Sequence, residues 1–267
     1  MTMLGIIGGI APGSTIQYYR RIIAAYRGSR AGGAYPRILI NSIDLNKLLN
    51  LASGNRLEEL TDFLAREVSV LATAGVSAAL FASNTPHLVF EAVQRRSSIP
   101  LLSIVEATCA EAESSGYGRV GILGTIFTMQ AGFYPEAFAK RGITVIPPTP
   151  EEQDFVHSRY LGELIEGVYR PETRSGMLSI LERMIRRDRL EAVILAGTEL
   201  PLLFRSADVA GVPLLDTTDI HVNAGVAHLL SYEHATGGHR PIKGPVLREL
   251  DQESGDQPPD RKERMIQ

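Results

Sequence analysis

The chain has 267 residues, a formal net charge of −3 and one cysteine, Cys109. A nucleic-acid-binding surface needs a basic excess that this chain lacks, and a single cysteine excludes an intrachain disulfide framework. No apolar run reaches the roughly 18–20 residues of a membrane-spanning helix, and the first residues lack the basic segment of a signal peptide. The six histidines are scattered along the chain. We therefore expect a cytoplasmic protein with no metal site and with neither nucleic acid nor a membrane as a partner.

Apolar runs and helical periodicities alternate along the first hundred residues, which predicts a parallel sheet with helical crossovers. The expected strands are 4–9, 37–44, 76–80 and 100–104, and the expected helices begin near 16 and cover 56–74 and 105–112. Ser14 or Thr15, in the Gly-rich turn after the first strand, is expected to cap the helix near Ile16. This turn has neither the spacing of a dinucleotide fingerprint nor the Gly-Lys-Ser/Thr of a P-loop. We therefore reject NAD and ATP and expect no cofactor.

The pattern restarts near residue 119, and three landmarks recur at nearly one interval. Gly5 and Gly121 lie 116 residues apart, the two Pro-Leu-Leu segments lie 113 apart, and Ser83 and Gly197 lie 114 apart. Such a long interval indicates a duplicated α/β domain rather than a solenoid repeat. We predict a first domain of residues 1–104 with 216–233, a second of 105–215, and a flexible, non-catalytic tail of 234–267.

The second half is expected to repeat the same kinds of element. The expected strands are 119–124, 143–146 and 192–196, and the expected helices run to about 140, over 151–168, over 175–187 and, after the last strand, to about 232.

A short polar cluster follows a buried apolar run in each half. Ser83, Asn84 and Thr85 follow the first run, and Thr198 and Glu199 follow the second. Small molecules bind beyond the carboxyl ends of parallel strands in open α/β sheets, so two such strand ends facing each other would form a cleft. Turn chemistry favours the same residue types at any strand end. The pairing of the two clusters is what favours a functional site.

Several motifs, in order over roughly residues 1–232, together resemble the aspartate/glutamate racemase superfamily. They are Gly8-Gly9 with Ser14-Thr15 and Tyr18-Tyr19, Asn84-Thr85-Pro86-His87, Gly124-Thr125 with Thr128-Met129, Thr198-Glu199-Leu200, and Asp216-Thr217-Thr218 with His221. The resemblance implies two pseudo-symmetric flavodoxin-like α/β domains with parallel sheets and an active site in the cleft between them. It also implies a homodimer and cofactor-independent chemistry at the α-carbon of a small carboxylic acid.

The chain departs from this family at both acid–base positions. The family's racemases use two cysteines, and this chain has Ser83 and Gly197 in their places, while Cys109 sits at neither. A cysteine thiol can be brought to its thiolate near neutral pH, whereas a serine hydroxyl is a poor base without a partner. The standard two-thiol racemisation is therefore excluded.

The remaining polar residues supply candidates for binding and catalysis. The resemblance places a carboxylate cradle at Ser14, Asn84, Thr85, Thr125, Thr128 and Thr198. Glu199 is the candidate base, or it orients the cradle by hydrogen bonds. His87 is either an acid–base partner of Ser83 or a structural helix cap, and His157 and His221 are weaker candidates.

The stretch after Asp44 is apolar over residues 48–52. Racemases for acidic amino acids often carry polar or basic residues there, and an apolar wall cannot stabilise an unpaired carboxylate. Aspartate and glutamate are therefore not the favoured substrates.

Three functions remain open at this point. The first is a racemase-like isomerase that works through Glu199 and a histidine. The second is a lyase or cyclase of specialised metabolism on the same scaffold, and the third is a non-catalytic ligand-binding homologue. Turnover that survives Ser83→Ala and Glu199→Gln would contradict the enzyme hypotheses, and binding without turnover would favour the third.

Overall fold

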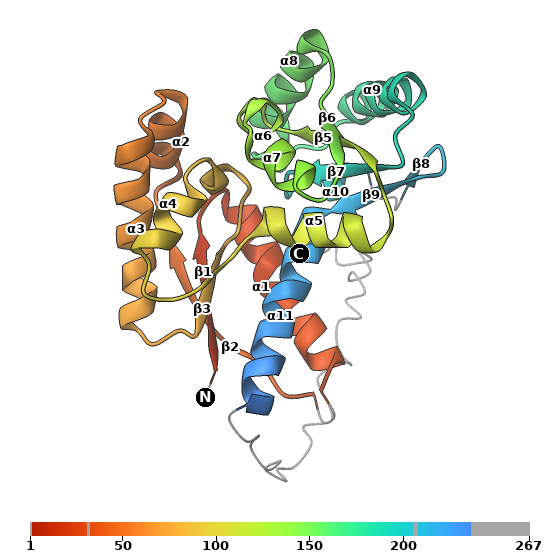
Figure 1. Ribbon diagram of the computed structural model, residues 1–267. Coiled ribbons are helices and arrows are strands. Elements are labelled where there is room, and N and C mark those ends of the chain that lie inside the picture. Colours follow the sequence, from red (N-terminus) through yellow and green to blue (C-terminus); the bar gives the residue numbers. More distant parts are fainter. Residues whose placement is uncertain (1, 31–32, 205–207, 236–267) are drawn as a thin grey trace, which may run out of the picture.

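A computed structural model describes residues 2–30, 33–204 and 208–235 (Figure 1); most of the predicted tail, 236–267, lies outside these ranges. The first half builds a four-stranded parallel sheet in the order β2-β1-β3-β4. Its strands are β1 (Met3–Gly8), β2 (Arg37–Ser42), β3 (Ala78–Phe81) and β4 (Leu101–Leu102), and its helices are α1 (Pro12–Gly28), α2 (Leu45–Ser53), α3 (Leu57–Thr73), the 3₁₀ turn η1 (Thr85–Leu88) and α4 (Phe90–Arg96).

The second half builds a five-stranded sheet in the order β6-β5-β7-β9-β8, in which only β8 is antiparallel. Its strands are β5 (Arg119–Gly124), β6 (Thr144–Ile146), β7 (Ala192–Ala196), β8 (Asp208–Val209) and β9 (Val212–Asp216). The helices of this half are α5 (Ile104–Ser114), α6 (Ile126–Gln130), α7 (Phe133–Ala139), α8 (Pro150–Arg159), the π-helical turn η2 (Tyr160–Leu164), α9 (Pro171–Asp188), α10 (Leu200–Phe204) and α11 (Thr217–Ala235). No helix within the described ranges has the length and apolarity to cross a membrane.

The predicted α/β fold with two mainly parallel sheets is confirmed. Without β8, the second sheet repeats the strand order of the first, with β5 in the place of β1 and β7 in the place of β3. Gly5 and Gly121 occupy equivalent strand positions. A Cβ atom at Gly5 would lie 2.9 Å from Leu71, and one at Gly121 would lie 2.6 Å from Leu190. The recurring glycine thus lets an apolar side chain approach the central strand in each half.

Helices cover both faces of each sheet. Successive strand residues point to opposite faces, so neighbouring residues of one strand pack against different helices. In β1, Ile7 packs with the buried faces of α2, α3 and α4, whereas Ile6 packs with α1 and α11. In β7, Val193 packs toward α8, α9 and α10, and Ile194 packs toward α5 and α7. Figure 1 shows α11 beside α1 and α5 where the two halves meet.

Two expectations about local structure are wrong. Helix α1 begins at Pro12, not near Ile16, and Ala11 is its N-cap. Ser14 therefore lies inside the first turn, where its hydroxyl contacts backbone carbonyls, and the Thr15 hydroxyl accepts from the Gly9 N–H at 2.8 Å. The helix expected over 151–168 stops being α-helical at Arg159 and continues as η2.

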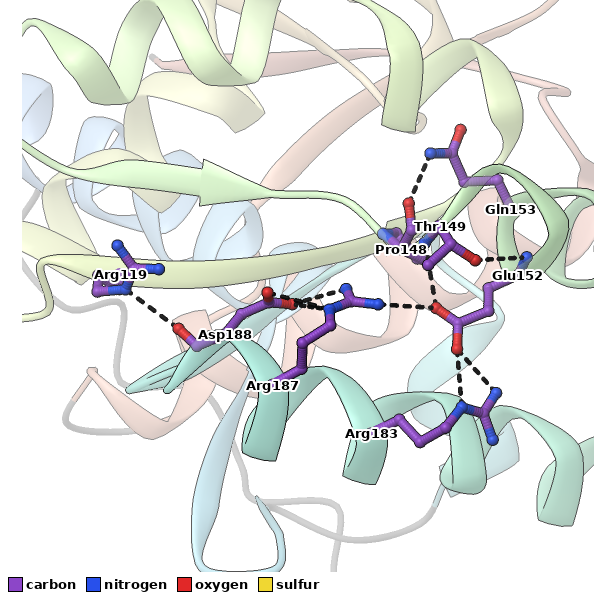
Figure 2. Close-up of polar contacts among 8 residues, drawn as sticks. All are labelled: Arg119, Pro148, Thr149, Glu152, Gln153, Arg183, Arg187 and Asp188. Carbon is purple, nitrogen blue, oxygen red and sulfur yellow. Dashed lines mark hydrogen bonds and ion pairs between the residues drawn. The ribbon is translucent and has the colours of Figure 1, made fainter.

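The start of α8 is fixed by charged and capping interactions (Figure 2). Thr149 and Glu152 form a capping box, in which each side chain accepts a hydrogen bond from the other's backbone N–H. The Glu152 carboxylate also pairs with Arg183 of α9 at 2.8 Å, and more distantly with Arg187. The Gln153 amide donates to the Pro148 carbonyl at 2.8 Å. These contacts hold α8 against α9 and so set the position of η2 beyond its far end.

Candidate active site

A narrow pocket lies between the carboxyl ends of β3 and β7, with a cavity volume of about 40 Å³. The polar residues that line it come from both halves and are Ser83, Asn84, Thr85, Thr125, Thr128, Tyr160, Thr198 and Glu199. Its apolar wall consists of Ile10, Ala11, Leu45, Leu49, Phe127, Leu161, Ile165 and Ala196, and Gly197 lies just beyond the end of β7, before Thr198 and Glu199. The two strand ends singled out in the sequence therefore do face each other.

The first-half side of the pocket is built on Asn84, which is buried. Its side-chain oxygen accepts a 2.8 Å hydrogen bond from the Tyr134 hydroxyl of α7, and its amide nitrogen lies 3.5 Å from the Thr217 hydroxyl. Asn84 thus links the end of β3 to helices α7 and α11 of the second half by side-chain hydrogen bonds. Ser83 is half-buried beside it, and no hydrogen-bond partner for its hydroxyl is found within the described ranges.

The second-half side holds a buried carboxylate with two hydroxyl donors. One oxygen of Glu199, Oε2, accepts hydrogen bonds from the Tyr160 hydroxyl and, at 2.7 Å, from the Thr198 hydroxyl. Burial raises the pKa of Glu199, and the two hydroxyls act in the opposite direction. Burial and the neighbouring carboxylate raise the pKa of Tyr160 well above its usual range. At neutral pH the phenol therefore keeps its proton and donates it in the hydrogen bond to Oε2 of Glu199.

Tyr160 also fills the space that a side chain at position 197 would need. A Cβ atom built on Gly197 would lie 2.5 Å from the Tyr160 hydroxyl oxygen and 2.6 Å from its Cε2 atom. Real Cβ atoms essentially never make such contacts, so the glycine and the tyrosine depend on each other sterically. The phenol thus stands where a side chain at position 197 would begin.

The remaining cradle residues line the pocket beside β5. The hydroxyls of Thr125 and Thr128 lie 3.3 Å apart, at the start of α6. The Ile126 N–H donates to Nδ1 of His157 at 3.3 Å, which leaves the other ring nitrogen to carry the proton in the neutral form. Burial lowers the pKa of His157. His157 thus supports the cradle from behind and is not among the residues that line the pocket.

Three other candidates and Cys109 also lie outside the pocket. The buried Ser14 hydroxyl contacts the carbonyls of Ile10, Ala11 and Ala82 at 2.8–3.0 Å, which joins the loop after β1 to the end of β3.

His221 is fully buried and bonded at both ring nitrogens, to the Tyr18 hydroxyl and the Leu102 carbonyl, each at 2.9 Å. Cys109 is buried in α5, with its sulfur 3.7 Å from the Ala137 carbonyl.

His87 is the third of these candidates, and it lines a separate depression between α4 and α7. Its ring stacks on Phe90 with a centroid distance of 4.6 Å. Neither ring nitrogen has a hydrogen-bond partner among the side chains and backbone groups that the structure describes. Burial lowers its pKa to about 3. This placement suits a neutral packing residue, and it separates His87 from Ser83.

Sequence reasoning missed Tyr160 and the apolar residues Leu161 and Ile165, whereas the apolar stretch 48–52 did indicate the wall to which Leu49 of α2 contributes. The only signal for Tyr160 was indirect: a glycine in the place of a catalytic side chain leaves a space that some other residue must fill.

The two sheets and the pocket between the ends of β3 and β7 define a two-halved α/β protein with a small-molecule site at its pseudo-symmetric centre. The chain matches the family model for Asp/Glu/hydantoin racemases over residues 7–225. It therefore belongs to this family, as the motifs indicated, and its single cysteine is consistent with the loss of both catalytic thiols.

Individual relatives agree with this assignment. The broad specificity amino-acid racemase RacX of Bacillus subtilis (strain 168) is 22% identical over 236 residues, which cover 86% of this chain and 100% of RacX. A candidate Asp/Glu racemase from Yersinia pestis has a similar structure, with a TM-score of 0.79 and 30% identity. An aspartate racemase homologue from Pyrococcus horikoshii OT3 aligns with a TM-score of 0.74 and 33% identity. Both structural alignments cover 86% of this chain and 100% of the other.

The contact between Gly197 and Tyr160 predicts a coupled effect on stability. Gly197→Ala should lower the free energy of unfolding by about 1–3 kcal/mol, because the new methyl group overpacks against the ring. In a Tyr160→Ala background the same change should cost much less. Urea unfolding of the four proteins measures this coupling, and Gly28→Ala, where a Cβ meets nothing within 4 Å, is the matched control. Additive effects, within about 0.5 kcal/mol, would contradict the contact.

The buried neutral His87 predicts a loss of stability in acid. Its pKa rises from about 3 in the folded chain to about 6.5 in the unfolded chain, so the unfolded state gains a proton first as the pH falls below about 6.5. Between pH 7 and pH 5 the native protein should lose roughly 2 kcal/mol more stability than His87→Phe. Urea unfolding at both pH values tests this, and equal losses in the two proteins would contradict a neutral, buried His87.

Proposed function

We propose that this chain is a cofactor-independent, racemase-like isomerase that moves a proton at the α-carbon of a small carboxylic or amino acid without thiol chemistry. The observation that carries the proposal is the Tyr160–Glu199 pair in the pocket. It supplies a proton donor and a proton acceptor within a family whose chemistry depends on proton transfer. Hydroxyls and an amide surround this pair and suit a bound carboxylate.

The lining of the pocket supports a substrate with one carboxylate and an apolar remainder. Of the pocket residues that the structure describes, none is Lys, Arg or His. A second carboxylate on the substrate would therefore be buried without a cation, which is costly. Leu45 and Leu49 of α2, with Leu161 of η2 and Ile165 directly after it, offer apolar contact instead. The broad specificity named for RacX is compatible with such a pocket.

A lyase on the same scaffold is the second candidate, and one observation favours it. The pocket has a proton-transfer pair on the β7 side, whereas Ser83 on the β3 side has no basic partner. A reaction that removes a group from the α-carbon and then protonates one face of the resulting carbanion needs only one such pair. This candidate predicts a product of different mass, which separates it from an isomerase.

Exchange of the α-proton in D₂O tests the proposal. Both enantiomers of alanine, valine, leucine and phenylalanine, together with 2-phenylpropionate, are incubated with the protein, and the α-proton signal is followed by NMR. We expect exchange with at least one probe and a loss of about 100-fold or more in Glu199→Gln, because removing a general acid–base group costs that much.

Cys109→Ala is the matched control and should keep the full rate, because the thiol lies buried in α5. Exchange that is unchanged in Glu199→Gln would contradict the assignment of the base. A probe that binds but shows neither α-proton exchange nor a change of mass would favour the non-catalytic homologue. If no probe binds, exchanges or changes mass, the proposed substrate class is contradicted.

A further inference from the structure

The π-helical turn η2 sets where Tyr160 points. Helix α8 is α-helical to Arg159, and the chain then continues through Tyr160–Leu164 with π-type hydrogen bonding. A π-turn accommodates an extra residue and so rotates the side chains that follow it. Tyr160, Leu161 and Ile165 all reach the pocket from this segment. Such turns are rare and occur frequently at functional sites.

The pocket contains no other titratable side chain than those of Tyr160 and Glu199, among the residues that the structure describes. The two are hydrogen-bonded to each other. Both are buried, with Glu199 6% and Tyr160 5% exposed. The Oε2 atom of Glu199 already accepts hydrogen bonds from the hydroxyls of both Tyr160 and Thr198. Of the two side chains, it is the Tyr160 phenol whose oxygen lies in the space above Gly197.

We propose that Tyr160 is the catalytic residue on the β7 side of the pocket and that it exchanges protons with the substrate through a relay to Glu199. This inference rests on the proposed function. The Tyr160 hydroxyl takes the place of the family's second thiol, and Glu199 is the acceptor that makes this hydroxyl reactive.

The relay balances in protons and electrons. The substrate Cα–H bond breaks and its proton forms a new bond to the Tyr160 oxygen, while the original phenol proton moves along the existing hydrogen bond to Oε2 of Glu199. The electron pair of the broken bond stays on the substrate as an enediolate, which hydroxyl and backbone donors of the cradle can stabilise. The return step reverses each transfer, and it gives the opposite enantiomer when the planar enediolate has turned its other face to Tyr160 before reprotonation. Thr198 keeps its own proton throughout and holds the Glu199 oxygen in place.

A purely structural role makes a different prediction. If the phenol only fills space above Gly197, the ring alone is needed, and Tyr160→Phe keeps the ring while it removes the hydroxyl. The relay instead needs the hydroxyl itself. It also requires that Tyr160 and Glu199 act as one unit, so that removing both costs no more than removing either one.

The exchange assay in D₂O, run with the probe that the native chain exchanges fastest, separates these roles. The relay predicts that Tyr160→Phe lowers the exchange rate by about 100-fold or more, that Glu199→Gln does the same, and that the double variant loses little further. Binding of the probe, measured by ligand-observed NMR, should change by less than about threefold. Tyr117→Phe, a half-buried tyrosine beside β5, is the matched control and should exchange at the native rate.

Exchange that persists at the native rate in Tyr160→Phe, with Glu199→Gln inactive, would overturn the relay and leave the proposed function standing. Absence of exchange in the native chain would overturn both. If Tyr160→Phe fails to fold, judged by circular dichroism, incorporation of 3-fluorotyrosine at position 160 keeps the hydroxyl and lowers the pKa of the phenol. The relay then predicts a changed pH profile of exchange, and an unchanged profile would contradict it.

Discussion

The pocket depends on the hydrogen bond between the Tyr160 phenol and the Glu199 carboxylate. A carboxylate buried to this degree needs donors to stay charged, and the hydroxyls of Tyr160 and Thr198 provide them. Tyr160 reaches this position only because position 197 has no side chain. Gly197 and Tyr160 are therefore one steric unit: the ring fits only where position 197 lacks a side chain. The capping box and ion pairs at the other end of α8 hold the helix that carries it.

The location of the pocket could be predicted from the sequence, because it follows from the duplicated strand ends at Ser83 and Gly197. Parallel strands bring their carboxyl ends to one edge of each sheet, and polar residues at those ends identified most of the polar lining of the pocket. The contribution of Tyr160 could not be predicted. Tyr160 follows α8 in a segment expected to be one continuous helix, and nothing in the sequence indicates where α-helical geometry gives way to a π-turn.

His87 and Ser14 illustrate why roles are harder to predict than positions. Both lie next to pocket residues in the chain, yet η1 turns His87 toward Phe90 and the early start of α1 turns Ser14 onto backbone carbonyls. A shift of one or two residues in the start of a helix changes which way a side chain points. Sequence spacing alone does not fix those boundaries.

The central claim is that proton transfer is confined to the β7 side of the pocket, where Tyr160 and Glu199 lie, because Ser83 on the other side has no basic partner in the part of the chain that the structure describes. The stereochemical course of exchange tests this most directly. One enantiomer of an exchanging probe is incubated in D₂O, and chiral chromatography with mass detection follows the deuterated product. The claim predicts that deuterium enters with retention many times faster than the opposite enantiomer forms, because isomerisation then requires the planar intermediate to turn its other face to Tyr160 before it is reprotonated. Equal rates of exchange and inversion would show a second acid–base group on the β3 side and would contradict it.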